Sequence, residues 1–208
     1  MSHTEQVTGI ILAGGRGSRM GGVDKGLERF QGQPLAFRAM MRLIPQVSEV
    51  LINANRNIGV YEGFGVTVLP DPIDGYQGPL AGMLSGLPYT ETEFLQAIPC
   101  DVPNFPTDLV ATLHEGLVSS GMPLAYPVTI EADGTRQPHP VFLLMRAEVH
   151  DSLLVYLQQG GRKIDRWTSD LGAAEVVFPD SAAFFNANTV DELRALEAPG
   201  APGAPGTP

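Results

Sequence analysis

Three basic residues stand in a glycine-rich segment directly behind the first apolar run of the chain. The segment "ILAGGRGSRMGGVDKG" spans residues 11–26 and holds six glycines together with Arg16, Arg19 and Lys25. Glycine amides can approach an anion closely because no Cβ stands in the way, and the three basic side chains can reach the same anion. The segment therefore favours a polyphosphate ligand. The alternative is a glycine turn whose basic side chains are simply solvated.

Two familiar phosphate-binding loops do not fit this spacing. A Walker loop needs a lysine followed by Ser or Thr directly after its last glycine, whereas Lys25 is followed by Gly26. A dinucleotide fingerprint needs a glycine three residues beyond Gly17, where the chain has Met20. The segment therefore belongs to neither class.

A second candidate for chemistry is Asp101, at the end of the apolar run "EFLQAIPCD". Open parallel sheets bind ligands at the carboxyl ends of their strands, which is where this carboxylate is expected. One or two carboxylates commonly hold Mg²⁺ while the substrate's phosphates supply further ligands. The alternative is that Asp101 caps the helix expected after Pro106.

The segments that must position these residues alternate between strand and helix patterns. Strands are expected at 7–13, 48–55, 66–69, 93–101, 123–128, 140–145 and 174–179, and helices at 34–47, 79–87, 105–117, 148–159 and 188–196. This alternation is typical of βαβ units and predicts an α/β fold with a parallel sheet.

Length and composition bound the organisation of the chain. The 208 residues fit one domain, expected over 1–197, and the Pro/Gly repeat of 198–208 is expected to be a disordered tail. The single cysteine, Cys100, excludes an internal disulfide. With no apolar run long enough for a membrane and no signal-peptide pattern, the expected location is the cytoplasm.

The charge distribution disfavours polyanionic partners. The formal net charge is -10, and none of the thirteen basic residues lies between Arg56 and Arg136. A nucleic acid or an anionic membrane would be repelled by most of such a surface. A small anion held by local groups is still compatible with it.

Seven blocks of the sequence, in order, resemble the molybdenum cofactor guanylyltransferases. They are "LAGGRGSRMGGVDKGL", "INAN", "DPIDGYQGPLAG", "PCDVP", "QPHPVF", "GGRKIDRW" and "FFNANTVDEL". The resemblance implies a Rossmann-like three-layer α/β/α sandwich with a mostly parallel sheet, of the nucleotide-diphospho-sugar transferase type. It also implies transfer of GMP from GTP to Mo-molybdopterin, which releases pyrophosphate and forms the guanine dinucleotide cofactor.

Carried over residue by residue, the resemblance assigns the nucleotide to the N-terminal half. It implies catalytic roles for Lys25, Arg19 and Asp101, with Asp101 as the ligand of the cofactor Mg²⁺. The residues it implies for nucleotide binding are Leu12, Ala13, Gly14, Gly15, Lys25, Asn53, Asp71 and Asp101. The residues alone favour a different interpretation, with Asn53 as a turn former and Asp71 as an X-Pro turn residue.

The resemblance assigns the molybdopterin substrate to the C-terminal half. The residues implied for this substrate are Arg162, Lys163, Asn186 and Asn188, together with Gly78 and Gly82 from the N-terminal half. Helix packing would also explain the two glycines, a solvated helix start the two bases, and a turn the two asparagines. If "FFNAN" is extended, both asparagines share one face.

The implied partners are GTP and molybdopterin, with transient contacts to molybdenum insertion proteins and apo-molybdoenzymes. Two competing functions remain open at this point. One is a cytidylyl- or sugar-phosphate nucleotidyltransferase with the same loop, and the other is a non-catalytic carrier of the pterin or nucleotide.

Overall fold

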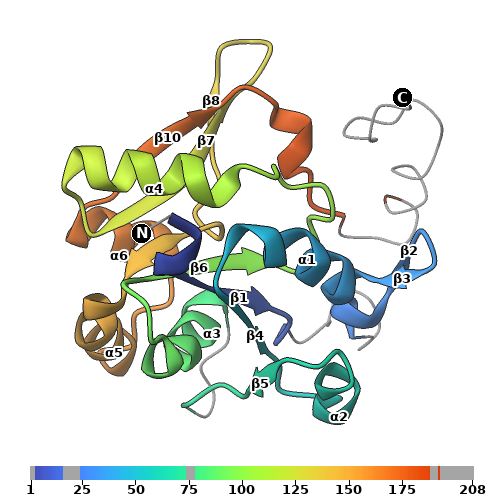
Figure 1. Ribbon diagram of the computed structural model, residues 1–208. Coiled ribbons are helices and arrows are strands. Elements are labelled where there is room, and N and C mark those ends of the chain that lie inside the picture. The colour runs from blue at the N-terminus through green and yellow to red at the C-terminus, as the bar shows by residue number, and fades with distance from the viewer. Residues whose placement is uncertain (1–2, 16–23, 74–77, 188–191, 193–208) are drawn as a thin grey trace.

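A mixed sheet forms the centre of the molecule (Figure 1). The computed structural model describes residues 3–15, 24–73, 78–187 and 192. Within these residues the sheet has eight strands in the order β10-β7-β9-β6-β1-β4-β5, and β8 pairs with β7. The strands are β1 (Val7–Leu12), β4 (Glu49–Asn53), β5 (Thr67–Leu69), β6 (Phe94–Pro99), β7 (Leu124–Ile130), β8 (Arg136–Pro138), β9 (Leu144–Arg146) and β10 (Ala174–Phe178). A separate hairpin joins β2 (Arg29–Phe30) to β3 (Gln33–Pro34).

Helices cover both faces of this sheet, as Figure 1 shows. One layer contains α1 (Leu35–Leu43), α2 (Ile58–Glu62) and α4 (Leu109–Ser120), and the other contains α3 (Pro79–Gly86), α5 (His150–Gln158) and α6 (Ile164–Leu171). Successive side chains of a strand point to opposite faces, so Ile11 packs in the first layer's core and Ile10 in the second. The expected three-layer α/β/α sandwich is confirmed.

The four strands β6, β1, β4 and β5 run parallel and end together. Their register sets Leu12 beside Asn53 on one side and beside Pro99 on the other. The pairing continues one residue further, since the amide of Ala13 donates to the carbonyl of Asn53 over 2.9 Å. The segments that follow these strands are therefore brought to one edge of the sheet.

The remaining strands make the sheet mixed rather than wholly parallel. Strand β9 lies antiparallel between β6 and β7, while β10 is parallel to β7. The strand expected at 140–145 is correspondingly short and shifted, because only Leu144–Arg146 pairs in a regular ladder. Before it, Leu143 continues the contact with β6 by accepting a hydrogen bond from the Ala97 amide over 2.8 Å.

Two parts of the expected organisation lie outside the described residues. These are most of the helix expected at 188–196 and the Pro/Gly segment 198–208. Among the helices that the structure does describe, none combines the length and the apolar character that crossing a bilayer requires.

Candidate functional site

A cavity of about 300 Å³ opens at the carboxyl edge of the parallel strands. Its walls come from segments that follow β1, β5 and β6, from the start of α3, and from a C-terminal segment. The lining residues are Leu12, Ala13, Gly14, Gly15, Lys25, Asn53, Asp71, Gly78, Pro79, Pro99, Cys100, Asp101, Val141 and Asn186. Most of the described residues that sequence analysis assigned to the nucleotide and the substrate are thus brought together.

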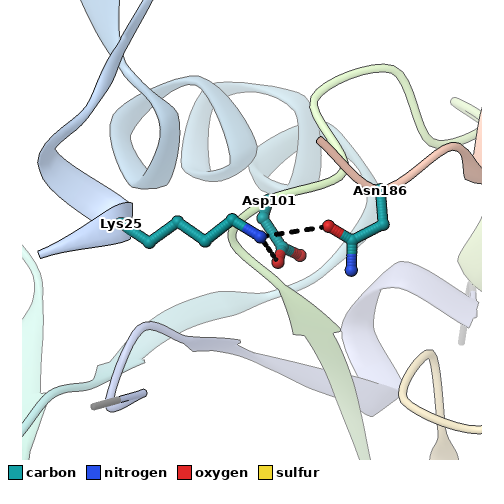
Figure 2. Close-up of polar contacts among 3 residues, drawn as sticks. All are labelled: Lys25, Asp101 and Asn186. Atoms are coloured by element: carbon teal, nitrogen blue, oxygen red, sulfur yellow. Dashed lines mark hydrogen bonds and ion pairs between the residues drawn. The ribbon is translucent and has the colours of Figure 1, made fainter. Parts of the chain in front are cut away.

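Lys25, Asp101 and Asn186 meet at one side of this cavity (Figure 2). The Lys25 ammonium lies 2.5 Å from Asp101 Oδ2 and donates to Asn186 Oδ1 over 3.2 Å. The side chains of the ion pair are only 21% and 15% exposed, so water screens them weakly. The three residues come from distant parts of the sequence, so both halves of the chain contribute to this side of the cavity.

Asp101 follows β6 directly and is not a helix cap. Helix α4 begins at Leu109, and the residue that precedes it is Asp108. The capping alternative is therefore wrong. The second carboxyl oxygen, Asp101 Oδ1, is buried and has no hydrogen-bond partner among the described residues. A buried acceptor without a partner is costly, and a cation that binds at this cavity would satisfy it.

The cavity thus fits a magnesium ion that arrives with a phosphate ligand. The described residues contain no group of three or more His, Cys, Asp or Glu side chains that could hold a metal. Asp101 would then offer a carboxylate to the ion, and Mg²⁺ sites of this type rely on substrate phosphates and water for the other positions. Cys100 is a poor candidate ligand because burial and the neighbouring Asp101 charge raise the pKa of its thiol.

Asn186 reaches the cavity because its segment is anchored on both sides. The Ala187 amide donates to the Asp101 carbonyl over 3.1 Å, and the Ala187 side chain packs with Phe30 and Leu35. On the other side Phe184 ends a 3₁₀ turn, Ser181–Phe184. The expectation that Asn186 and Asn188 share a strand face is not tested, since Asn188 lies outside the described residues and no described strand includes residues 185–187.

Asn53 and Asp71 form the opposite side of the cavity. Asn53 is 2% exposed, and its amide donates to Asp71 Oδ1 over 3.0 Å and to the Leu69 carbonyl over 3.1 Å. Asn55 adds a second link, because its Nδ2 donates to Asp71 Oδ2 over 2.9 Å and its Oδ1 accepts from the Asp71 amide over 2.8 Å. Asp71 is thereby held in one orientation at the cavity, which a simple X-Pro turn would not require.

Two of the singled-out glycines make room for these asparagines. A Cβ at Gly14 would come within 2.7 Å of Asn53 Oδ1 and 2.9 Å of Asn55 Nδ2. A Cβ at Gly82 would come within 2.5 Å of Asn53 Oδ1 and 2.8 Å of Leu12 Cδ2. Gly82 does not line the cavity, so its position in α3 reflects packing behind Asn53. Gly78, in contrast, lines the cavity with a φ of 133°, a conformation that favours glycine.

Arg162 and Lys163 are not brought to this cavity. They lie between α5 and α6, where both side chains are exposed and neither residue lines it. The Lys163 carbonyl accepts a hydrogen bond from the Tyr156 hydroxyl over 2.9 Å, which fixes the backbone of this connection. Arg19, the third residue expected to be catalytic, lies outside the described residues.

Sequence analysis missed Asn55 and Arg56 as parts of the site. Besides its bonds to Asp71, Asn55 donates to the Gly14 carbonyl over 3.3 Å, and Arg56 donates to the Gly15 carbonyl over 3.1 Å. Both follow β4 and so share the sheet edge with the glycine-rich segment. Their position directly after the strand "LIN" was the available signal.

One residue from each of the blocks "GGRKIDRW" and "QPHPVF" has a packing role. Trp167 is 2% exposed in the second layer's core, and its indole donates to Ser152 Oγ over 3.3 Å. His139 stacks on the Phe184 ring at 4.6 Å and its Nε2 lies 2.9 Å from Thr129 Oγ1. Burial lowers the pKa of His139, which favours its neutral form.

Comparisons with known proteins agree with this arrangement. Residues 9–173 match the MobA-like NTP transferase domain. A molybdenum cofactor guanylyltransferase from Cupriavidus taiwanensis is 55% identical over 198 residues, which cover 95% of this chain and 100% of the relative.

Solved structures share the fold at much lower identity. The molybdopterin-guanine dinucleotide biosynthesis protein A of Archaeoglobus fulgidus superposes with a TM-score of 0.70 at 20% identity, over 90% of this chain and 95% of its own. The 4-diphosphocytidyl-2C-methyl-D-erythritol synthase of Anaerococcus prevotii gives 0.70 at 9% identity, over 92% and 94%. Since enzymes for different nucleotides share this fold, the family is assigned from sequence identity and not from the fold. The chain is a nucleotidyltransferase that belongs to the molybdenum cofactor guanylyltransferase family.

Proposed function

We propose that this cavity transfers GMP from GTP to the terminal phosphate of Mo-molybdopterin. An oxygen of the acceptor phosphate bonds to the α-phosphorus of GTP, the bond from that phosphorus to the bridging oxygen breaks, and pyrophosphate leaves. The observation that carries the proposal is the Lys25–Asp101 pair at the cavity wall, 2.5 Å long and mostly shielded from water. It sets a phosphate-binding cation beside a metal-binding carboxylate.

The acceptor phosphate is already anionic, so the site needs no strong general base. The rate then depends on alignment of the two phosphates and on neutralisation of the charge that they bring together. Lys25 supplies a positive charge at the cavity, and Arg19 is proposed to add a second one from the glycine-rich segment. Leu12, Ala13, Gly14 and Gly15 would contact the nucleotide largely through backbone groups.

Asp101 is proposed to hold Mg²⁺ together with phosphate oxygens of the nucleotide. When bound, the ion neutralises phosphate charge and orients the α-phosphate. Asp101 Oδ2 already pairs with Lys25 and Oδ1 has no partner among the described residues, so nucleotide binding would let Lys25 move to the phosphates. The same movement exposes the carboxylate to the cation, and the two ligands are expected to assist each other's binding.

The far side of the cavity is proposed to recognise guanine or its ribose. Asp71 lines the cavity, and two asparagines hold its carboxylate in place. A fixed carboxylate can accept two hydrogen bonds from neighbouring donors of one ligand, and guanine offers such a donor pair. Asn53 is then a support for Asp71, since its own amide is buried and already hydrogen-bonded.

The molybdopterin substrate is assigned to Gly78 and Asn186. Both residues line the cavity, and Asn186 comes from the C-terminal half of the chain. We keep Arg162, Lys163 and Asn188 as proposed contacts to the substrate outside this cavity, and Gly82 as a support behind Asn53. Within a single domain over 1–197, the N-terminal half would thus hold GTP and the C-terminal half the pterin.

The reaction defines its partners. GTP and molybdopterin are the small-molecule partners, and contacts with molybdenum insertion proteins and apo-molybdoenzymes would be transient steps before and after the transfer. The proposed compartment is the cytoplasm.

Pyrophosphate release tests the proposal. The protein is mixed with Mg²⁺, Mo-molybdopterin and one nucleotide at a time, and formation of the dinucleotide is followed by mass. We expect product with GTP and little with CTP or ATP. Product with CTP instead would favour the cytidylyltransferase alternative. Binding of GTP with no release of its pyrophosphate in the presence of the Mo-molybdopterin acceptor would favour the carrier alternative.

A further inference from the structure

A buried carboxylate lies directly beside Lys25 in the sequence but takes no part in the proposed reaction. Asp24 is 8% exposed and accepts hydrogen bonds from the Tyr61 hydroxyl over 2.6 Å and from Asn57 Nδ2 over 2.9 Å. Both partners are neutral groups from the segment at α2. A buried carboxylate is costly unless it is hydrogen-bonded, so these two donors stabilise it in this position.

The surroundings of Tyr61 keep its hydroxyl as a hydrogen-bond donor to the Asp24 carboxylate. Its side chain is fully buried, and its ring packs edge-on against Phe64 with the centroids 5.7 Å apart. Burial, the hydrogen bond to Asp24 and the charge of Asp24 all raise the pKa of the Tyr61 hydroxyl. The hydroxyl therefore keeps its proton over the whole working pH range, and Asp24 keeps its donor.

The same tyrosine also contacts the residue on the other side of Lys25. A Cβ at Gly26 would overlap the Tyr61 hydroxyl and would come within 3.3 Å of the Ala13 Cβ. Gly26 is thus enclosed between the tyrosine and the end of β1. Tyr61 fixes both neighbours of Lys25, one by a hydrogen bond and the other by close packing.

Asn57 supports the arrangement at some conformational cost. It has a φ of 51°, a left-handed conformation that is uncommon for a residue other than glycine, although asparagine tolerates it better than most. Its side chain then donates to Asp24 Oδ2. A local strain of this kind persists where surrounding contacts hold it. Here the contact is the hydrogen bond from Asn57 to Asp24, which directly precedes Lys25.

We propose that Tyr61 is a positioning residue for Lys25. Tyr61 acts on Lys25 through the Asp24 carboxylate and the backbone of Gly26. A lysine side chain has many rotamers and can direct its ammonium to a phosphate only from a fixed backbone. Tyr61 provides this fixed point without touching the substrate cavity itself. The inference rests on the proposed function, because it concerns how well Lys25 meets the transferred phosphate.

The test is a double-mutant cycle between Tyr61→Phe and Lys25→Met, measured as single-turnover formation of dinucleotide and pyrophosphate. Tyr61→Phe removes one charged hydrogen bond and keeps the ring, so we expect turnover to fall about tenfold with little change in the KM for GTP. In the Lys25→Met background the same substitution should change turnover by less than about twofold, because residues that act as a unit are not additive.

A second tyrosine offers a matched control. The Tyr126 hydroxyl donates to Glu175 over 3.0 Å, also a tyrosine–carboxylate bond, but Tyr126 does not line the cavity. Tyr126→Phe should leave turnover unchanged. Thermal unfolding of every variant checks folding, and Gly26→Ala serves as a second variant that disturbs the same contact if Tyr61→Phe does not fold.

The outcomes separate the two claims. Wild-type turnover in Tyr61→Phe, or an equal loss from Tyr61→Phe in both backgrounds, overturns the positioning role while the proposed function stands. Absence of dinucleotide and pyrophosphate from the wild-type protein with GTP contradicts the proposed function instead, and full turnover in Lys25→Met contradicts the role of Lys25.

Discussion

Two ion pairs of the same length have very different surroundings in this protein. Lys25 Nζ and Asp101 Oδ2 are 2.5 Å apart, as are Arg136 Nη2 and Glu175 Oε2. The side chains of the first pair are 21% and 15% exposed and face the cavity. Those of the second are 53% and 45% exposed and connect β8 with β10 near the edge of the sheet.

The comparison shows that the effect of an ion pair on stability and on ligand binding depends on its burial and its neighbours rather than on its length. Water and dissolved salt screen the exposed pair, and such pairs contribute little to stability. Removing one member of the shielded pair leaves the other without its counter-charge in a poorly hydrated place. The shielded pair also lies where two charged ligands are proposed to bind, and both of its members would then have alternative partners.

The largest expected difference between the two pairs is in turnover. Lys25→Met and Asp101→Asn should each lower GMP transfer by about 10²- to 10³-fold, the range seen when one group that stabilises developing charge is removed. Glu175→Gln is the control, and its turnover should match wild type. Single-turnover pyrophosphate release measures all three. Comparable losses in the control and in the two site variants would show that the pairs do not differ as claimed.

The Lys25–Asp101 pair is also expected to control the affinity for a divalent metal ion. Because Lys25 pairs with Asp101, the nucleotide-free protein should bind Mn²⁺ weakly, and GTP should tighten this binding. Lys25→Met removes the competing charge and should raise the Mn²⁺ affinity without nucleotide by at least about tenfold. Electron paramagnetic resonance titration gives the free Mn²⁺ directly. The idea fails if the Lys25→Met and wild-type affinities agree, or if Asp101→Asn binds as well as Lys25→Met.

A smaller effect is expected at the asparagine side of the cavity. Gly14→Ala places a Cβ against Asn53 and Asn55 and should lower the free energy of unfolding by about 1–3 kcal/mol, as overpacking does. Gly15→Ala is the matched control, because nothing described lies within 4 Å of its Cβ and its φ is not in the left-handed region. Urea unfolding compares the two. Equal stability of both variants would mean that the asparagines give way easily.

The smallest effect belongs to the exposed pair. A double-mutant cycle on Arg136 and Glu175 should give a coupling of at most about 1 kcal/mol at neutral pH. Hydrogen bonds from Arg136 and Tyr126 lower the pKa of Glu175, so its contribution is complete above the ordinary value of 4.5 and is lost as the pH falls through the folded pKa. Urea unfolding at pH 7 and pH 3 measures this. A coupling that grows on acidification would contradict the assignment.

The sequence predicted the centre of the site for a simple reason. Segments after neighbouring parallel strands must share an edge, so the residues behind β1, β4, β5 and β6 were expected to meet, and they do. Asn186 could be placed only by resemblance, because a loop anchored through the Ala187 amide has no periodic pattern. Gly82 was assigned to a ligand although it packs on Asn53, a contact between segments that spacing alone does not indicate.

The contacts of Tyr61 and Asp24 that support Lys25 were not predicted from the sequence. Tyr61 lies in α2, a helix of five residues that is too short to show a helical repeat. No pattern in the sequence marks Asp24 as a buried acceptor. Only the tertiary fold brings α2 against the turn Lys25–Leu27, and local patterns do not carry that information.

We expect Lys25 and Asp101 to separate when the site is occupied, so that together they hold one nucleotide–metal complex. A crystal structure with a non-hydrolysable GTP analogue and Mg²⁺ would show this arrangement. The triphosphate should lie in the cavity, with the Lys25 ammonium on a phosphate oxygen and the cation on Asp101. A nucleotide bound elsewhere, or bound in the cavity with the Lys25–Asp101 pair still closed and no cation on Asp101, would contradict this expectation.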